Sequence, residues 1–414
     1  MIKKAKGLLR FFAAVCAASF MQLPVDAGEK PLYAPVFEGS FLQGWLCRDW
    51  TAERWQTELE DMKTAGFRSV ILQSAVDLTY EQTDSAKPKT DPDAFTLNSA
   101  YALYPTELVP GSSGIRALEF ALSAAKETGM HVYIGTVSDS RWWNYGWGVP
   151  DEFLPVWSDS NGAQCQTLIR EVWGLYGAEY GEQIAGFYYN NEIWNIDAAC
   201  AGAYRSQYAQ ILGGNIRVSL DAINSVCPEK PLIISPFYNS DLSSSAEYAA
   251  FWKETAAEAQ FRPQDIFAHQ DGGGRDYSTD TLNEWAAALQ GAVGGMMHFW
   301  INNEAFHADS SIRSPESVRQ NYLATVQAEK HLLFSWNHYY HGKQDAEYEK
   351  FMRTMTGDVN ADGACTVEDA VSLSRWLMHD RIHVANWLAG DLDADGVLTA
   401  ADLSLIKRIL ISGE

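Results

Sequence analysis

Cysteine is scarce in this chain, with only six among 414 residues. Cleavage of an N-terminal leader, argued below, would leave five, and no two of these form a CxxC pair. An odd number without paired spacing excludes a disulfide framework and a cysteine zinc site. We expect the five to be buried as small apolar side chains, with a single Cys165–Cys200 bridge as the alternative; the five are Cys47, Cys165, Cys200, Cys227 and Cys365.

Positive charge is also scarce. The chain has 31 Lys and Arg against 53 Asp and Glu, which gives a net charge of −22. Nucleic acids and anionic membranes repel such a surface, so neither is expected as the main partner. Solubility and cation binding by acidic loops account for the excess of carboxylates.

A long apolar run appears only near the N-terminus, and it is too short to span a bilayer. Lys3, Lys4, Lys6 and Arg10 form a positive segment, Leu8 to Phe20 is mostly apolar, and small residues precede position 28. These features predict a signal peptide over residues 1–27 with cleavage after Ala27, and therefore a secreted, extracellular protein without a membrane span. No second apolar stretch supports the alternative, a retained membrane anchor.

Between residues 35 and 350 we predict a (β/α)8 barrel. Eight short apolar runs alternate with helical stretches, as expected for parallel strands that are buried on both faces. The runner-up, a doubly wound open sheet, would call for a glycine-rich loop after the first strand, where Trp45-Leu46-Cys47-Arg48 stands. The runs are Phe41–Trp45, Ser69–Gln73, His131–Val137, Ile184–Tyr189, Leu232–Ser235, Ile266–His269, Met296–Trp300 and Leu332–Trp336.

Helix signals separate these runs. Residues 51–65 are amphipathic and stop at Gly66, and residues 117–128 stop at Gly129. Ser314-Pro315 marks the start of a further helix, because proline suits the first helical turn. Residues 341–356 are expected to contain the last barrel helix.

Near the C-terminus a 12-residue pattern occurs twice, with an offset of 33 residues. Calcium binds six to eight hard oxygens, and such a loop supplies them from positions 1, 3, 5, 7, 9 and 12, with glycine at position 6 for the turn. Gly363 and Gly396 occupy position 6. The predicted ligands are Asp358, Asn360, Asp362, Ala364, Thr366 and Asp369 in the first loop, and Asp391, Asp393, Asp395, Val397, Thr399 and Asp402 in the second.

The last ligand of each loop is Asp rather than Glu, and no helix belonging to the repeat comfortably precedes the first loop. In this respect the segment 355–414 resembles a type I dockerin, in which a loop and one following helix occur twice. The resemblance implies two bound calcium ions, calcium-dependent folding, and docking to a cohesin module of a scaffoldin in a cellulosome. It also implies partner recognition by Val367-Glu368, Ala400-Ala401, Ser374-Arg375 and Lys407-Arg408.

Carboxylates follow two of the predicted strands, at the face where barrel active sites lie. Glu192 follows the fourth strand, and Glu304 lies four residues beyond Trp300 at the end of the seventh. Glycoside hydrolysis requires two carboxyl groups, one as acid and one as nucleophile or base. Because Glu304 lies beyond the expected strand end, Asp271 after the sixth strand is the alternative partner of Glu192.

The motifs GFYxxxE, ISPF, QDGGG and FWxNxE, at residues 186–304, resemble a family of uncharacterised glycosidase-like barrels. An Asn-Glu pair after strand four and a second Glu near strand seven also resemble the large retaining-glycosidase clan. That resemblance implies that Glu192 is the acid/base, that Glu304 is the nucleophile and that Asn191 binds the sugar.

Aromatic side chains at strand ends are expected to stack on sugar rings. Several crowd residues 141–147 after the third strand, and Gln270 is expected to orient the substrate. Because His269, His298 and His338 show no ligand spacing, no cofactor is expected in the barrel. The predicted sugar contacts are Trp45, Trp142, Trp143, Tyr189, Tyr238, Trp300, Asn191 and Gln270.

These features favour a cellulosomal glycoside hydrolase acting on a plant or dietary polysaccharide or oligosaccharide. The alternative is a non-catalytic carbohydrate-binding barrel on the same scaffold. An esterase or peptidase is less favoured, because no GxSxG or HExxH motif occurs in the sequence.

Overall fold

The computed structural model describes residues 36–84, 86–145, 152–195, 204–326, 328–380, 384–393 and 395–412. The predicted signal peptide and Cys200 lie outside these residues. Within them, Cys47, Cys165 and Cys227 are buried free thiols, as expected, whereas the free thiol Cys365 is only half-buried, contrary to the prediction. No helix of the described residues is long and apolar enough to cross a membrane.

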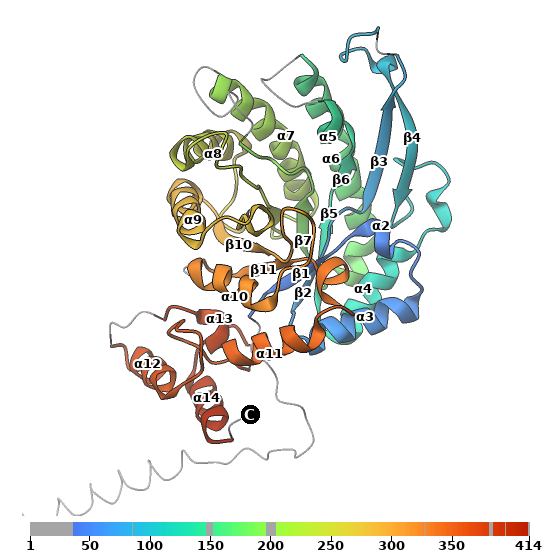
Figure 1. Ribbon diagram of the computed structural model, residues 1–414. Helices are drawn as coiled ribbons and strands as arrows, with labels where there is room; N and C mark the ends of the chain where they lie inside the picture. Colours follow the sequence, from blue (N-terminus) through green and yellow to red (C-terminus); the bar gives the residue numbers. More distant parts are fainter. Residues whose placement is uncertain are drawn as a thin grey trace, which may run out of the picture. The chain divides into compact units, whose positions relative to one another are not determined.

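Eight parallel strands form a closed barrel in the order β1-β11-β10-β9-β8-β7-β5-β2, with helices around it (Figure 1). The prediction of a (β/α)8 barrel is confirmed, and the open sheet was wrong. The strands are β1 (Gly39–Leu42), β2 (Ser69–Leu72), β5 (His131–Gly135), β7 (Ile184–Tyr189), β8 (Leu232–Ile234), β9 (Ile266–Gln270), β10 (His298–Glu304) and β11 (His331–Phe334).

Apolar side chains fill the inside of the barrel, which explains the apolar runs in the sequence. A second and larger core lies between the strands and the surrounding helices, so most strand residues are buried on both faces. The interior cluster consists of Phe41, Ile71, Tyr133, Tyr188, Ile233, Ile266, Ala268, Trp300 and Leu332.

The predicted helices are present with the expected ends. The side chain of Thr51 caps the helix that follows it, Ser314 caps a helix that begins with Pro315, and Gly129 ends another with φ 71°. The helices are α3 (Ala52–Thr64), α4 (Ala117–Thr128), α6 (Phe153–Tyr180), α7 (Arg205–Val226), α8 (Ser245–Ala259), α9 (Thr279–Val293), α10 (Pro315–Ala324) and α11 (Asp345–Met355).

Two strand boundaries differ from prediction in a way that affects the site. β10 begins and ends later than the apolar run Met296–Trp300, so Glu304 is the last residue of a strand. Asn302 and Asn303 continue the strand although they are polar, because buried side chains accept their hydrogen bonds. β1 ends at Leu42, which leaves Trp45 in the short helix α2 (Gly44–Cys47).

A small second sheet was not predicted. It consists of β4 (Phe95–Ala102), β3 (Val76–Gln82) and β6 (Val137–Asp139). β3 and β4 run antiparallel side by side and are conspicuous in Figure 1. A search for continuous apolar runs misses β3, because its buried and half-buried residues alternate, as in a strand with one exposed face.

The C-terminal segment repeats a loop followed by a helix, as predicted. α12 (Val367–Leu377) follows the first acidic loop, and α14 (Ala400–Ser412) follows the second, with the short α13 (Trp387–Gly390) between them. A separate apolar cluster holds these elements together; it consists of Val359, Ala370, Leu373, Val384, Leu392, Leu398 and Ile406.

Candidate functional site

A cavity of about 210 Å³ lies at the carboxyl ends of the barrel strands. Glu192 follows β7, Gln270 ends β9 and Glu304 ends β10, so residues far apart in sequence meet at one face. The structure thus brings two of the three predicted catalytic residues into one cavity. It is lined by Trp143, Glu192, Phe237, Tyr238, Gln270, Gly272, Gly274, Arg275, Glu304, Phe306 and Phe334.

The loop that carries Glu192 is held in place by the side chain of Trp142. The indole Nε1 of Trp142 donates a hydrogen bond of 3.2 Å to the backbone carbonyl of Glu192. Burial raises the pKa of the Glu192 carboxyl to about 7, although a hydrogen bond from the Gln270 side chain favours the ionised form. Gln270 is itself held by a 2.9 Å bond from Nε2 to the carbonyl of Ser235. Glu192 is therefore a carboxyl group that can carry a proton near neutral pH.

Glu304 is buried except for the part that faces the cavity. Its Oε2 atom accepts a hydrogen bond of 2.7 Å from the backbone N–H of Gly274. Burial, the negative charge of Asp271 and that of Glu192 raise the pKa of Glu304 to about 8. The charge of Glu192 therefore contributes to the raised pKa of Glu304, although less than burial and the charge of Asp271.

Asp271 does not line the cavity; it holds the turn beneath Glu304. Its Oδ1 accepts the N–H of Gly273 at 2.7 Å and that of Glu304 at 3.3 Å. Its Oδ2 accepts the side-chain amides of Asn303 at 2.8 Å and Asn321 at 3.2 Å. With both oxygens engaged in this way, Asp271 positions Glu304 and is poorly placed to attack a substrate.

The three glycines after Asp271 are required by close contacts. Gly272 has φ 79°, a conformation that favours glycine. A Cβ atom on Gly273 would lie 2.5 Å from Nη1 of Arg313, and one on Gly274 would lie 2.5 Å from the ring of Phe306. In this turn the backbone closely approaches the carboxylate of Glu304.

The predicted aromatic contacts differ in where the structure places them: some line the cavity and others lie outside it. Trp143 is 47% exposed and lines the cavity. Tyr238 also lines it and is fixed by stacking on Trp285 at 4.2 Å between ring centroids. Trp142 is buried against Trp157 and supports the Glu192 loop instead. Trp45 is exposed beside His338 but is not part of the cavity lining.

Three further predicted sugar contacts lie elsewhere. The side-chain amide of Asn191 donates to Asn161 at 2.9 Å, and the hydroxyl of Tyr189 donates to Asn215 at 2.7 Å. Trp300 belongs to the apolar barrel interior. Successive residues of a strand face opposite sides, so Tyr188 points into the barrel while Tyr189 points toward the helices.

In the first acidic loop the ligand candidates converge through backbone contacts. Asp358 accepts the N–H groups of Asp362 and Gly363, and Asp369 accepts those of Asn360 and Thr366. Burial, with the charges of Asp369 and Asp362, raises the pKa of Asp358 to about 6. Mutually repelling carboxylates of this kind fit a site for a divalent cation.

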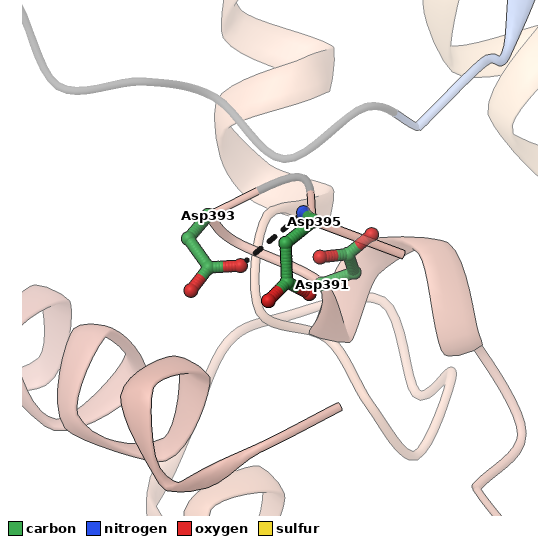
Figure 2. A group of neighbouring side chains, drawn as sticks. All are labelled: Asp391, Asp393 and Asp395. Atoms are coloured by element: carbon green, nitrogen blue, oxygen red, sulfur yellow. Dashed lines mark hydrogen bonds between the residues drawn. The ribbon is translucent and has the colours of Figure 1, made fainter. Parts of the chain in front are cut away.

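The second loop gathers Asp391, Asp393 and Asp395, which offer carboxylate oxygens within 4.8 Å of one another (Figure 2). The Oδ1 atom of Asp391 is buried and has no hydrogen-bond partner in the described residues. A buried carboxylate oxygen without a partner is costly, and a cation would satisfy it. The donor set therefore fits calcium, as predicted.

Comparison with protein families now places the chain. The model of a family described as "Domain of unknown function (DUF4434)" matches residues 37–347. The chain belongs to the DUF4434 family. The model of the type I dockerin domain matches residues 356–411 of this DUF4434 protein, so the predicted dockerin is confirmed. Type I dockerin domains bind calcium, and their presence implies binding to a cohesin and association with a cellulosome. No curated protein matches the chain.

Solved structures share the fold of the DUF4434 barrel. One is entitled "a putative alpha-L-fucosidase", from Bacteroides thetaiotaomicron VPI-5482, with 18% identity, TM-score 0.54, and 80% of this chain and 95% of that chain covered. Two others are the intracellular xylanase TsXylA from Thermoanaerobacterium saccharolyticum (14%, TM-score 0.43, covering 74% and 89%) and a beta-mannanase from blue mussel Mytilus edulis (13%, 0.44, covering 77% and 91%). At 18% identity, the likeness to the first of these structures shows the fold alone.

Some residues of the DUF4434 site were not predicted from sequence. Phe237 lies in the ISPF motif and Phe334 in a predicted strand, but their rings were not assigned a role. Phe306 and Arg275 lie just beyond the FWxNxE and QDGGG motifs, and only the tertiary fold shows that such connecting residues line the cavity. Arg313, which partly offsets the raised pKa of Glu304, was missed for the same reason.

Proposed function

We propose that the barrel is a retaining glycoside hydrolase in which Glu192 is the acid/base and Glu304 the nucleophile. The observation that carries this is that both carboxyl groups line one cavity at the carboxyl face and interact electrostatically. Hydrolysis of a glycosidic bond requires two such groups, one to protonate the leaving oxygen and one to attack the anomeric carbon.

The roles follow from the surroundings of each carboxyl. Glu304 accepts a backbone N–H from Gly274, and the positive charge of Arg313 favours its ionised form. A nucleophile must be held in a fixed direction, as Glu304 is by Gly274. Since the pKa of Glu304 is about 8 and that of Glu192 about 7, the reactive form is the minor one in which the proton lies on Glu192. Glu192 is held by its backbone and by Gln270 and faces the cavity, which suits a group that gives up and regains a proton.

The cavity accounts for substrate class and size. Its aromatic walls, formed by Trp143, Phe237 and Tyr238 among others, suit the apolar faces of sugar rings. At about 210 Å³ it is smaller than the roughly 300–1,000 Å³ of many ligand sites. This favours a single sugar unit at a chain end over a long internal segment of polysaccharide.

We further propose that the protein is secreted by way of residues 1–27 and acts while docked to a scaffoldin. The dockerin supports this proposal, because cohesin binding places a hydrolase beside other enzymes on the same substrate. Calcium, held by the two acidic loops, would fix the loops and orient the helices that contact the cohesin.

A glycan hydrolysis screen with product analysis tests the proposal. Glu192→Gln and Glu304→Gln should each lower turnover by about 10³-fold or more, whereas Glu329→Gln, an exposed residue that pairs with His298, should not. NMR of the first product should show retained anomeric configuration. If the wild type releases no product and both it and the Glu192→Gln variant bind sugar, the barrel is instead a carbohydrate-binding module.

Azide distinguishes the two candidate nucleophiles. Azide should restore turnover of an activated glycoside by Glu304→Ala and give a glycosyl azide of inverted configuration, because the small anion replaces the missing carboxylate. Asp271→Ala should give no such product. A glycosyl azide from Asp271→Ala alone would transfer the nucleophile role to Asp271.

A further inference from the structure

Among the residues that line the active-site cavity, Arg275 is the one with a positive charge. It is the last residue of the one-turn 3-10 helix η4 (Gly273–Arg275), and its side chain is exposed. The other ionisable groups of the lining, Glu192, Glu304 and Tyr238, are neutral or negative. A cation at this place is therefore a candidate for contact with the substrate.

The backbone of Arg275 is held next to the reacting carboxyl. Its N–H donates to the carbonyl of Gly272 at 3.0 Å, and the preceding residue, Gly274, donates to Glu304 at 2.7 Å. The turn cannot shift without disturbing Glu304. The backbone from which the Arg275 side chain extends is thus anchored on one side of the cavity by the same turn that fixes the proposed nucleophile.

Among the residues that the structure describes, no acidic group pairs with the guanidinium of Arg275. In the described part of the chain, Arg275 makes no ion pair and no side-chain hydrogen bond. The adjacent Asp276 is bound to Nδ1 of His307 at 2.5 Å and accepts the N–H of Ala308. Asp271 is saturated by four donors, and Glu304 is held by Gly274. The donors of Arg275 are therefore free for a ligand.

We propose that Arg275 binds an anionic substituent of the sugar in the cavity, so that the substrate is an acidic carbohydrate carrying a carboxylate or sulfate. This rests on the proposed hydrolase function and specifies its substrate. The planar fork of guanidinium donors matches two oxygens of a carboxylate or sulfate. In a chain of net charge −22, an unpaired arginine beside two glutamates compensates the repulsion that an acidic substrate would otherwise meet.

The test compares matched p-nitrophenyl glycosides: glucuronides against glucosides, galacturonides against galactosides, and 6-sulfated against unsulfated forms, each as both anomers. Wild type should prefer an acidic member of at least one pair. Arg275→Gln should reduce that preference, as a ratio of kcat/KM values, by roughly tenfold or more. Arg275→Lys should restore part of it. The control is Arg217→Gln, an arginine of α7 that pairs with Glu258 outside the cavity.

A binding measurement separates this inference from the hydrolase proposal. Saturation-transfer NMR measures the binding of glucuronate, galacturonate and glucose 6-sulfate. Each is titrated into the Glu192→Gln variant and into the double variant that also carries Arg275→Gln. Binding of an acidic sugar that is lost in the double variant supports the role of Arg275 even without hydrolysis. Hydrolysis of neutral glycosides with no acidic preference, or acidic sugars bound equally by both variants, overturns it.

Discussion

The Oε2 atom of Glu304 accepts a hydrogen bond of 2.7 Å from the backbone N–H of Gly274. The two residues belong to neighbouring strand ends, β10 and the turn after β9. A side chain at position 274 would separate them, since its Cβ would lie 3.2 Å from that oxygen and 2.5 Å from the ring of Phe306. The glycine-rich turn is thus part of the geometry of the carboxylate.

Replacement of Gly274 by alanine should impair activity more than stability. Displacement of a reacting group by about 1 Å can reduce rate by roughly 10²-fold, and a loss of kcat of that order is expected. The measurement is kcat together with a thermal melt. Gly291→Ala in α9 is the control, because a Cβ there meets nothing within 4 Å. Unchanged kcat for Gly274→Ala would contradict the role given to this contact.

The carboxyl pair predicts a bell-shaped pH profile. With pKa values raised to about 7 for Glu192 and about 8 for Glu304, the pair holds one proton mainly between these values. Below about pH 7 a second proton neutralises both carboxyl groups, and above about pH 8 the last proton is lost and no acid remains. Because Glu304 has the higher pKa, the reactive form with the proton on Glu192 is a minor fraction of the singly protonated enzyme. The profile of kcat/KM should therefore peak between pH 7 and 8. A maximum near pH 5 would disagree with this assignment.

Replacement of two adjacent tryptophans should affect different properties, the stability in one case and the KM in the other. Trp142 is buried on Trp157, so Trp142→Ala should lower the free energy of unfolding by about 3–5 kcal/mol. Trp143 is 47% exposed in the cavity, so Trp143→Ala should raise KM severalfold and change stability by less than about 0.5 kcal/mol. Urea denaturation and steady-state kinetics measure the two effects. Equal destabilisation by both variants would show that Trp143 is core.

Calcium should control the dockerin and leave the barrel folded. Chelation should abolish cohesin binding and the helical structure of residues 358–412. Hydrogen exchange measures the effect: the dockerin amides should lose their protection from exchange, while the barrel amides keep theirs. Asp391→Asn should weaken calcium binding by roughly tenfold or more, because even outer-shell changes cost 10–100-fold. Asp280→Asn in α9 is the control. Cohesin binding that persists in a chelator would contradict the calcium assignment.

The sequence predicted the architecture because barrel strands and duplicated loops have strong local patterns. Glu192 and Glu304 could be found because strand order determines which residues share a face. The end of β10 was predicted too early, since Asn302 and Asn303 look like a loop. They remain in the strand because Ser235 and Asp271 accept their side-chain hydrogen bonds, a compensation that only the folded sheet provides.

Residues in connecting segments were less predictable. Trp142 and Trp143 are neighbours of one type, and only the direction of α5 (Arg141–Tyr145) decides that one is buried and the other faces the cavity. Asp271 was assigned to chemistry because it follows a strand. Its role as a positioning residue depends on Asn321, which comes from a helix 50 residues later in the chain.

The chain between the last barrel helix and the first calcium loop is very short. α11 ends at Met355 and the loop begins at Asp358, so Thr356 and Gly357 alone intervene. Two residues reach at most about 7 Å when fully extended. A barrel tethered this closely cannot sweep over a distant surface once the dockerin is held. The reach of the docked barrel must come from the scaffold that carries it.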